Sequence, residues 1–184
     1  MGATGRTVRE AIAQGGIMPF DPMLFRQVLG RFATGVTVVT ACHGEVKHGM
    51  TANAFSSVSL NPPLILISVD KKANMHDILM HEDAFCVNIL AEHRSEWSSW
   101  WAGKAPKEGD QFTDIPYSTR ETGSPVLEEC LAYIDCKVWA RYDAGDHTLF
   151  LGEVQEAALN DDPNLKPLLF FSSKYRKLAE EESL

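Results

Sequence analysis

The alternation of apolar and polar residues predicts one early helix followed by a series of strands. Asp21-Pro22 is typical of a helix start, with the aspartate as N-cap and the proline as the first helical residue. Apolar residues then recur at helical spacing and predict an amphipathic helix, namely Leu24, Phe25, Val28, Leu29 and Phe32. The β-branched run at 36–40, ended by a turn at Gly44, predicts the first strand of a hairpin.

Further strands are predicted at 64–69, 85–90, 131–142, 148–157 and 168–171. The clearest is 131–142, where small or apolar residues alternate with larger or charged ones. The turn at 143–146 predicts that this strand forms a hairpin with the next. Short helices are expected at 74–81 and 92–101, and a polar loop at 103–122.

The order of these elements indicates the fold class. Strands predominate and do not alternate regularly with helices, which favours a mainly β fold with helical additions, an antiparallel barrel, over a doubly wound sheet. The glycine-rich stretch 1–19 has few large apolar residues and is expected to form a flexible N-terminal arm. Residues 20–184 are then one domain, as a length of 184 residues also suggests.

Charge and hydropathy argue against two classes of partner. Lys and Arg number 17 against 25 Asp and Glu, which disfavours a nucleic-acid binder with a broad basic face. The longest stretch without charged residues, 48–69, is long enough to span a membrane but contains Asn53, four serines and two adjacent prolines. Because that polar load would be costly in a bilayer, no membrane association is expected.

Cysteine and histidine spacing indicates the compartment and excludes several kinds of site. The four cysteines form no Cys-x-x-Cys pair, and the N-terminus has no secretion pattern, so free buried thiols in a reducing cytoplasm are expected. The six histidines form no His-x-x-x-His, and no metal site is expected. The phosphate-binding glycine motifs of Rossmann and P-loop proteins and the Gly-x-Ser-x-Gly of hydrolases are absent from the sequence.

The unusual segment is 49–63, in which small and hydroxylated residues dominate. A flat polar heterocycle lying against a strand requires small side chains for close approach, backbone groups for its edge and hydroxyls for a phosphate tail. A Ser/Thr-rich strand at a sheet surface is the alternative that composition leaves open. Lys71 and Lys72 follow the next strand and could neutralise a phosphate or simply be solvated. Other polar residues beside apolar strands are Asn74, Asn88 and the pair Tyr175-Arg176.

Four blocks of the sequence together resemble the flavin reductase-like family, the small NAD(P)H:flavin oxidoreductases that serve two-component flavin monooxygenases. The blocks are RFATGVTVVT at 31–40, GMTANAFSSVSLNPP at 49–63, GDHTLFLGEV at 145–154 and PLLF at 167–170. They occur in family order, and the resemblance extends from Phe25 to about Leu178. It implies an FMN-binding split β-barrel, usually a homodimer with sites near the subunit interface.

The resemblance also implies roles for individual residues. Thr51, Ala52, Asn53 and Ala54 would line the isoalloxazine ring, and Ser56, Ser57, Lys72 and Asn74 would lie near the ribityl and phosphate groups. His147 would face the nicotinamide, its alternative being an ordinary hairpin residue. Tyr175 and Arg176 would contact flavin or nicotinamide, or merely cap the sheet, and Asn88 is a further cofactor-binding candidate.

The activity implied is hydride transfer from NADH, or alternatively NADPH, to N5 of FMN or FAD. The reduced flavin would then pass to a flavin-dependent monooxygenase component. One alternative is the same fold reducing another acceptor, a corrinoid cobalt centre or an Fe(III) chelate. Others are a noncatalytic flavin-binding module and an interaction protein without a cofactor.

Overall fold

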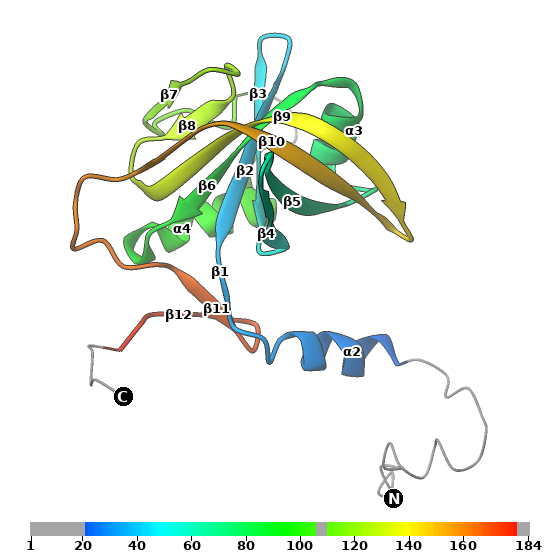
Figure 1. The fold of residues 1–184 in the computed structure, drawn as a ribbon. Helices are drawn as coiled ribbons and strands as arrows, with labels where there is room; N and C mark the ends of the chain where they lie inside the picture. Colours follow the sequence, from blue (N-terminus) through cyan, green and yellow to red (C-terminus); the bar gives the residue numbers. More distant parts are fainter. Residues whose placement is uncertain (1–20, 106–109, 180–184) are drawn as a thin grey trace, which may run out of the picture.

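The computed structural model describes residues 21–105 and 110–179, and its main element is a seven-stranded antiparallel sheet (Figure 1). The order across the sheet is β3-β2-β6-β9-β10-β5-β4. The strands are β2 (Thr37–His43), β3 (Val46–Ala52), β4 (Phe55–Leu60), β5 (Pro63–Asp70), β6 (Ala84–Leu90), β9 (Cys130–Ala144) and β10 (His147–Leu159). These include all the predicted strands except that at 168–171, which is β11 (Leu169–Phe171) of a smaller sheet. The uncharged segment 48–69 covers most of β3, all of β4 and most of β5.

Two smaller sheets flank the main one. β1 (Thr34–Gly35), β11 (Leu169–Phe171) and β12 (Lys174–Arg176) form one, and β7 (Tyr117–Thr119) and β8 (Pro125–Leu127) form the other. The expected flexible arm at 1–19 lies outside the described residues. In the described part of the chain no helix is both long and apolar enough to cross a membrane.

The inner face of the main sheet is clearest on β5, where buried and outward-facing residues alternate. Ile65, Ile67 and Val69 on β5 are buried with Phe150 of the paired strand β10. Residues between them, such as Leu66 and Ser68, point to the opposite face because successive side chains of a strand alternate. One strand thus supplies the core with one set of residues and a second surface with the other.

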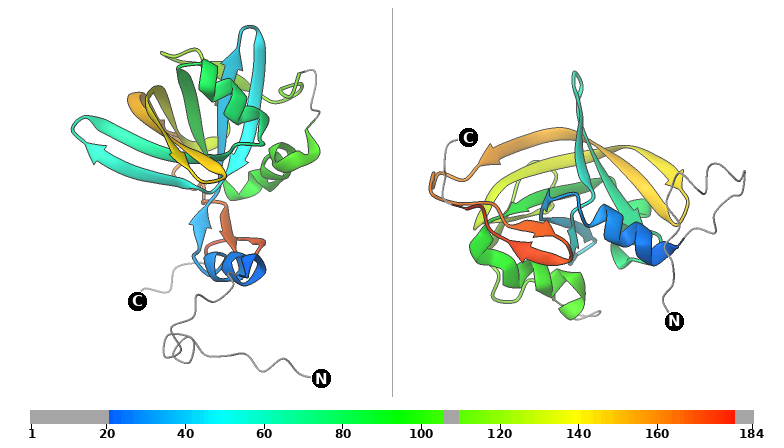
Figure 2. Two further views of the ribbon diagram at one scale, coloured as in Figure 1. Left: turned by 90° about the vertical axis from the view of Figure 1, so that its right-hand side faces the viewer. Right: turned by 90° about the horizontal axis from the view of Figure 1, so that it is seen from below.

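The prediction of a mainly β fold with helical additions is confirmed, but the sheet does not close into a barrel. β3 and β4 are its two edges and, within the described ranges, form no ladder with each other. Asn53 and Ala54 carry the chain directly from one edge to the other. Figure 2 shows the β4–β5 hairpin projecting from the rest of the sheet.

The predicted helices are found with differences in detail. α2 (Pro22–Leu29) begins at Asp21, whose carboxylate accepts a hydrogen bond from the Met23 amide at 2.9 Å. α3 (Asn74–His81) has the predicted bounds. The helix predicted at 92–101 is three short pieces: η1 (Glu92–Arg94), α4 (Ser95–Ser99) and η2 (Trp100–Lys104).

The prediction of a polar loop at 103–122 is wrong in part. Phe112 is 3% exposed and packs against Trp101 and Tyr117, and β7 lies within this stretch. An isolated apolar residue in a polar segment forms no periodic pattern, so the sequence did not predict that Phe112 is buried. These aromatic residues form a second core that holds η2 against β3.

Candidate functional site

A cavity of about 790 Å³ lies between the end of α2, β1 and the outer face of β5, a volume within the range of ~300–1,000 Å³ typical of small-molecule sites. We call it the large cavity. Leu29 and Phe32 supply one wall, residues 33–35 a second and residues 53–56 a third. Leu66 and Ser68, the outward residues of β5, complete it. The chain crossing from β3 to β4 is therefore a wall of this cavity.

The lining of the large cavity suits a flat ring with polar edges. Most of its surface is apolar, and its lining includes the small residues Gly35 and Ala54. The Thr34 hydroxyl is buried and finds no hydrogen-bond partner among the described residues. A buried hydroxyl without a partner is costly, so a ligand that accepts or donates a hydrogen bond there would relieve the cost.

A second, smaller cavity of about 170 Å³ adjoins the crossing from the other side. Thr51, Ala52 and Asn53 line it together with Ser98, Phe170 and Tyr175, and Asn53 lines both cavities. The Thr51 hydroxyl donates to the Ser98 carbonyl at 2.7 Å. The Ser98 and Tyr175 hydroxyls are hydrogen-bonded at 2.8 Å. The C-terminal hairpin is thereby joined to β3 beside the predicted ring-binding residues.

His147 is the first residue of β10 and shares a sheet face with the large cavity. It pairs with Asp70, while Leu149 pairs with Ser68. Paired residues of an antiparallel ladder point to the same face, so the side-chain row of His147 and Leu149 lies beside the row of Ser68 and Leu66. The histidine is thus placed on the outer face of β5 and β10, along the strands from the large cavity.

The neighbouring carboxylate determines how the His147 ring is held. His147 Nδ1 lies 2.7 Å from Asp146 Oδ1. The hydrogen bond from His147 holds the pKa of the Asp146 carboxyl below its usual range, so Asp146 is ionised near neutrality. Because a carboxylate can only accept, Nδ1–H is the donor, which leaves Nε2 as the nitrogen free to meet a substrate.

The predicted site residues are brought together only in part. Thr51, Ala52, Asn53, Ala54, Ser56 and Tyr175 line one or both cavities. Four others line neither cavity: Ser57, Lys72, Asn74 and Arg176. Ser57 faces away from Ser56 because neighbouring strand residues alternate. The roles of these four residues stay predictions.

Asn88 has a different environment from the other candidates. It is fully buried, and its amide nitrogen donates to the Val38 carbonyl at 3.2 Å and to the Thr40 hydroxyl at 3.1 Å. Its amide oxygen accepts from the Leu127 amide at 2.8 Å. These bonds join β6 to β2 and β8, and Asn88 lines neither cavity, so its predicted part in cofactor binding stays a prediction.

Several lining residues were missed at the level of the sequence. They are Leu29, Phe32, Thr34 and Gly35 near β1, Ser68 on β5, and Ser98 and Phe170 at the small cavity. The block at 31–40 contained a usable signal, since Thr34-Gly35 combines a hydroxyl and a small residue beside an apolar strand. Ser98 carried no such signal, because only the folding of α4 onto β3 brings it to the site.

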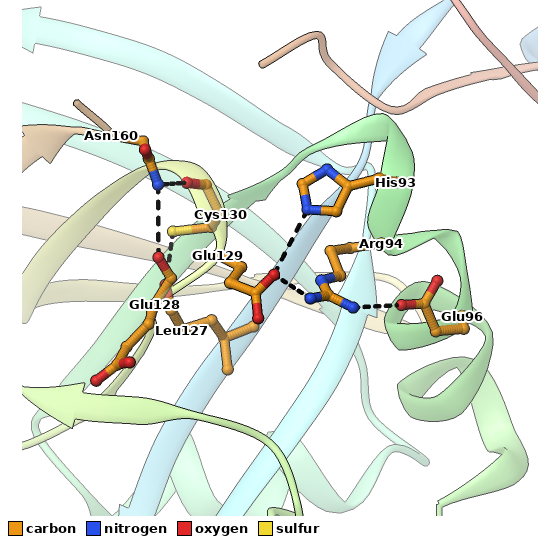
Figure 3. Close-up of polar contacts among 8 residues, drawn as sticks. All are labelled: His93, Arg94, Glu96, Leu127, Glu128, Glu129, Cys130 and Asn160. Carbon is orange, nitrogen blue, oxygen red and sulfur yellow. Dashed lines mark hydrogen bonds and ion pairs between the residues drawn. The ribbon is translucent and has the colours of Figure 1, made fainter. Parts of the chain in front are cut away.

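A separate polar cluster lies outside both cavities (Figure 3). Arg94 pairs with Glu129 and, at 3.1 Å, with Glu96, while His93 lies 3.6 Å from Glu129. Arg94 holds the pKa of the Glu129 carboxyl below its usual range. The cluster ties η1 to the turn between β8 and β9 and is structural.

Neither thiol nor metal chemistry is indicated near the cavities. The four cysteines are unpaired, and three are buried. Burial raises the pKa of Cys130 to about 11 and that of Cys136 to about 12, so both are unreactive thiols. The described ranges hold no group of three His, Cys, Asp or Glu side chains suited to a metal ion.

Comparison with known proteins defines the family. The model of the flavin reductase like domain matches residues 29–179, and the chain belongs to this family. It is 38% identical over 165 residues to the flavin-dependent monooxygenase, reductase subunit HsaB, of Mycobacterium tuberculosis, covering 89% of this chain and 86% of that protein.

Two further relatives are named as NADH-dependent enzymes that act on flavins. An NADH-dependent flavin reductase of Rhodococcus is 40% identical over 160 residues, covering 85% of this chain and 86% of that one. The solved structure of Streptomyces globisporus NADH:FAD oxidoreductase SgcE6, in complex with NAD and FAD fragments, superimposes with a TM-score of 0.81 at 38% identity. It covers 89% of this chain and 96% of that structure.

Proposed function

We propose that this protein is an NADH-dependent flavin reductase that supplies reduced FAD or FMN to a flavin-dependent monooxygenase component. The large cavity carries the proposal, because its small and apolar walls suit a flavin ring and its sheet face continues to His147. The relatives named for NADH-dependent flavin reduction and for service to a monooxygenase support it. The relative named for NADH-dependent flavin reduction also supports NADH, rather than NADPH, as the hydride donor.

The flavin, when bound, supplies the hydride acceptor, and this chain supplies binding and orientation. Ala54 and Gly35 permit close approach of a ring, and the Thr34 hydroxyl offers a hydrogen bond to its polar edge. Asn53, which lines both cavities, offers an amide beside the ring. Ser56, Ser57, Lys72 and Asn74 remain the proposed contacts of the ribityl and phosphate groups.

His147 is proposed to orient the nicotinamide. With Nδ1–H given to Asp146, its Nε2 can accept a hydrogen bond from the carboxamide of NADH. Such a contact would hold the nicotinamide in a near-attack position over the flavin, where orientation contributes much of the rate. Tyr175 and Arg176, on the C-terminal hairpin, are proposed to contact the flavin or the nicotinamide from the small cavity's side.

The assembly is proposed to be a homodimer in the cytoplasm. The apolar residues of α2 are exposed, and Phe32 is 77% exposed although it lines the large cavity. A second copy covering this surface would bury the apolar face and exclude water from the cavity. Four unpaired cysteines suit a reducing compartment.

The proposal is tested by following the loss of reduced-nicotinamide absorbance with FAD, FMN and riboflavin side by side, using NADH and then NADPH. Turnover with NADH and a flavin is expected. Flavin binding without anaerobic reduction by NADH would instead show a noncatalytic flavin-binding module. Rapid NADH oxidation only with a corrinoid or an Fe(III) chelate would show the other acceptor.

The role of His147 has its own test. His147→Ala is expected to lower kcat/KM for NADH by about tenfold or more, the effect of losing one hydrogen bond to a bound substrate. Dissociation of flavin, followed by fluorescence, is expected to stay the same. His43→Ala, on the far end of β2, is the matched control. Equal activity of the two variants would contradict the assignment.

A further inference from the structure

Lys71 makes three contacts with the short turn that precedes His147. Its backbone N–H donates to the Asp146 carbonyl at 3.0 Å. Its ammonium donates to the Gly145 carbonyl at 2.6 Å and forms an ion pair with Asp143. One residue at the end of β5 therefore holds both the backbone and a side chain of the β9–β10 turn.

Gly145 gives this turn its shape. Its φ of 72° is a conformation that side-chain-bearing residues rarely adopt and that glycine adopts readily. Two exposed carboxylates lie here, Asp143 near the end of β9 and Asp146 within the turn. The ammonium of Lys71 pairs with Asp143 and holds the Gly145 carbonyl, so it joins the end of β5 to the end of β9 and to the turn.

In the sequence, Lys71 is a candidate for neutralising a phosphate, but the contacts above already use its ammonium. Lys71 already has a carboxylate and a carbonyl as partners, so its charge is committed within the chain. The backbone N–H of Lys72 donates to the Asp70 carboxylate at 2.8 Å. The positive charge of Lys72 also helps to lower the pKa of the Asp146 carboxyl, but among the described residues the hydrogen bond and the ion pair that a lysine side chain makes at this turn are those of Lys71.

We propose that Lys71 is a positioning residue that sets the direction of the His147 ring toward the nicotinamide. The link runs through the turn: the Lys71 ammonium holds the Gly145 carbonyl, Gly145 precedes Asp146, and the Asp146 carboxylate accepts from His147 Nδ1. The backbone N–H of Lys71 also donates to the Asp146 carbonyl, a bond that a side-chain substitution leaves in place. A turn held in one conformation holds Asp146 and, through it, the ring nitrogen that remains for the substrate. This inference rests on the proposed function, because it assumes that His147 meets NADH.

The test compares Lys71→Met with Lys71→Arg and with Lys137→Met, an exposed lysine on β9, as the matched control. Lys71→Met is expected to raise KM for NADH by up to about tenfold, because a misdirected His147 ring would lose roughly one hydrogen bond to the substrate, with a smaller change in kcat and in KM for flavin. Lys71→Arg keeps the charge and donors and is expected to restore most of the affinity. A wild-type KM for NADH in Lys71→Met would overturn the proposal.

A double-mutant cycle with His147→Ala identifies the route of the effect. If Lys71 acts through His147, adding Lys71→Met to His147→Ala produces little further loss of kcat/KM for NADH. Equal fold-losses in both backgrounds would overturn the proposal, since Lys71 would then act independently.

A measurement without any cofactor separates this inference from the proposed function. Nitrogen NMR spectra of the histidine rings are expected to show Nδ1–H as the predominant tautomer of neutral His147 in the wild type and a mixture in Lys71→Met. An unchanged His147 spectrum would overturn the positioning role. Absence of NADH oxidation by the wild type, with the spectral change present, would overturn the proposed function alone.

Discussion

The inner row of β5 and the apolar face of α2 both have regular hydrophobic patterns, but the first is buried within the chain and the second is exposed. Ile65, Ile67 and Val69 are buried within the chain against Phe150. The apolar residues of α2 are all exposed, and this helix lies away from the main sheet beside the C-terminal hairpin (Figures 1 and 2). A pattern therefore predicts that a face will be covered, but not which surface covers it.

This difference in burial corresponds to a difference in role. The row of β5 stabilises the sheet, whereas the end of α2 forms a wall of the large cavity. An apolar wall that still faces solvent suits a site completed by another molecule. The inner row of β5 therefore serves stability, whereas the apolar face of α2 is available for assembly and binding.

The largest effect is expected from Phe150→Ala. Phe150 is 0% exposed, and its removal leaves a cavity in the main core, which should cost about 3–5 kcal/mol of unfolding free energy. Phe32→Ala, which removes the same side chain from an exposed position, should change the stability of the isolated subunit by no more than about 0.5 kcal/mol. Urea denaturation of both variants measures the difference. Similar losses in both would contradict it.

Gly49→Ala is expected to have the next largest effect. A Cβ on Gly49 would lie 2.4 Å from Nε1 of the buried Trp101, so η2 would have to move away from β3. Overpacking of this kind should cost about 1–3 kcal/mol, and the displacement would disturb the small cavity. Gly35→Ala is the control, because a Cβ there meets nothing within 4 Å. Thermal denaturation that fails to distinguish the two variants would rule out this packing.

Charges on α2 should affect assembly more than subunit stability. The double substitution Leu24→Glu and Val28→Glu places two carboxylates on the exposed apolar face. We expect the dissociation constant of the dimer to rise at least ~10-fold, which corresponds to about 1.4 kcal/mol of association free energy. Sedimentation equilibrium measures the change. Val46→Glu, on an exposed apolar position of β3, is the control. A wild-type protein that sediments as a monomer would refute the proposed partner of this face.

The smallest effect is expected from Asp135, a carboxylate inside the sheet. Burial raises its pKa, aided by Glu156 and Glu121, although two hydrogen bonds from Thr122 oppose the shift. The folded state therefore binds the proton more readily than the unfolded state.

The raised pKa gives the pH dependence a definite sign. The contribution of Asp135 to stability is greatest below its unfolded pKa and falls as pH rises through the raised folded pKa. Asp135→Asn should remove this part of the pH dependence, as urea denaturation across the acidic range would show. Identical pH profiles for the two proteins would contradict the shift.

Much of the fold was predictable because local patterns and turn residues agreed. The alternation along β9 and β10, the helix start at Asp21 and the turn at Gly44 each placed an element correctly. The polar loop predicted at 103–122 was wrong in part for a different reason. Phe112 is buried by contacts with Trp101 and Tyr117, aromatic residues that form no periodic pattern with it.

The candidate site was predictable where a single segment forms it. Residues 51–54 line the cavities because the crossing between the sheet edges is one continuous piece of chain. Asn88 resembled the other polar candidates in sequence, yet its side chain is used within the core. Thr34 and Ser98 reach the site only through packing of elements distant in sequence.

The sequence by itself determined the family, the order of strands and helices and the segment that forms the cavity wall, because these depend on local pattern and composition. The tertiary structure alone decided that Lys71 holds the turn before His147, that the Asn88 side chain is buried and hydrogen-bonded within the core and that the face of α2 is exposed. Those outcomes depend on which side chains meet across long separations in the chain, and neither spacing nor composition specifies such contacts.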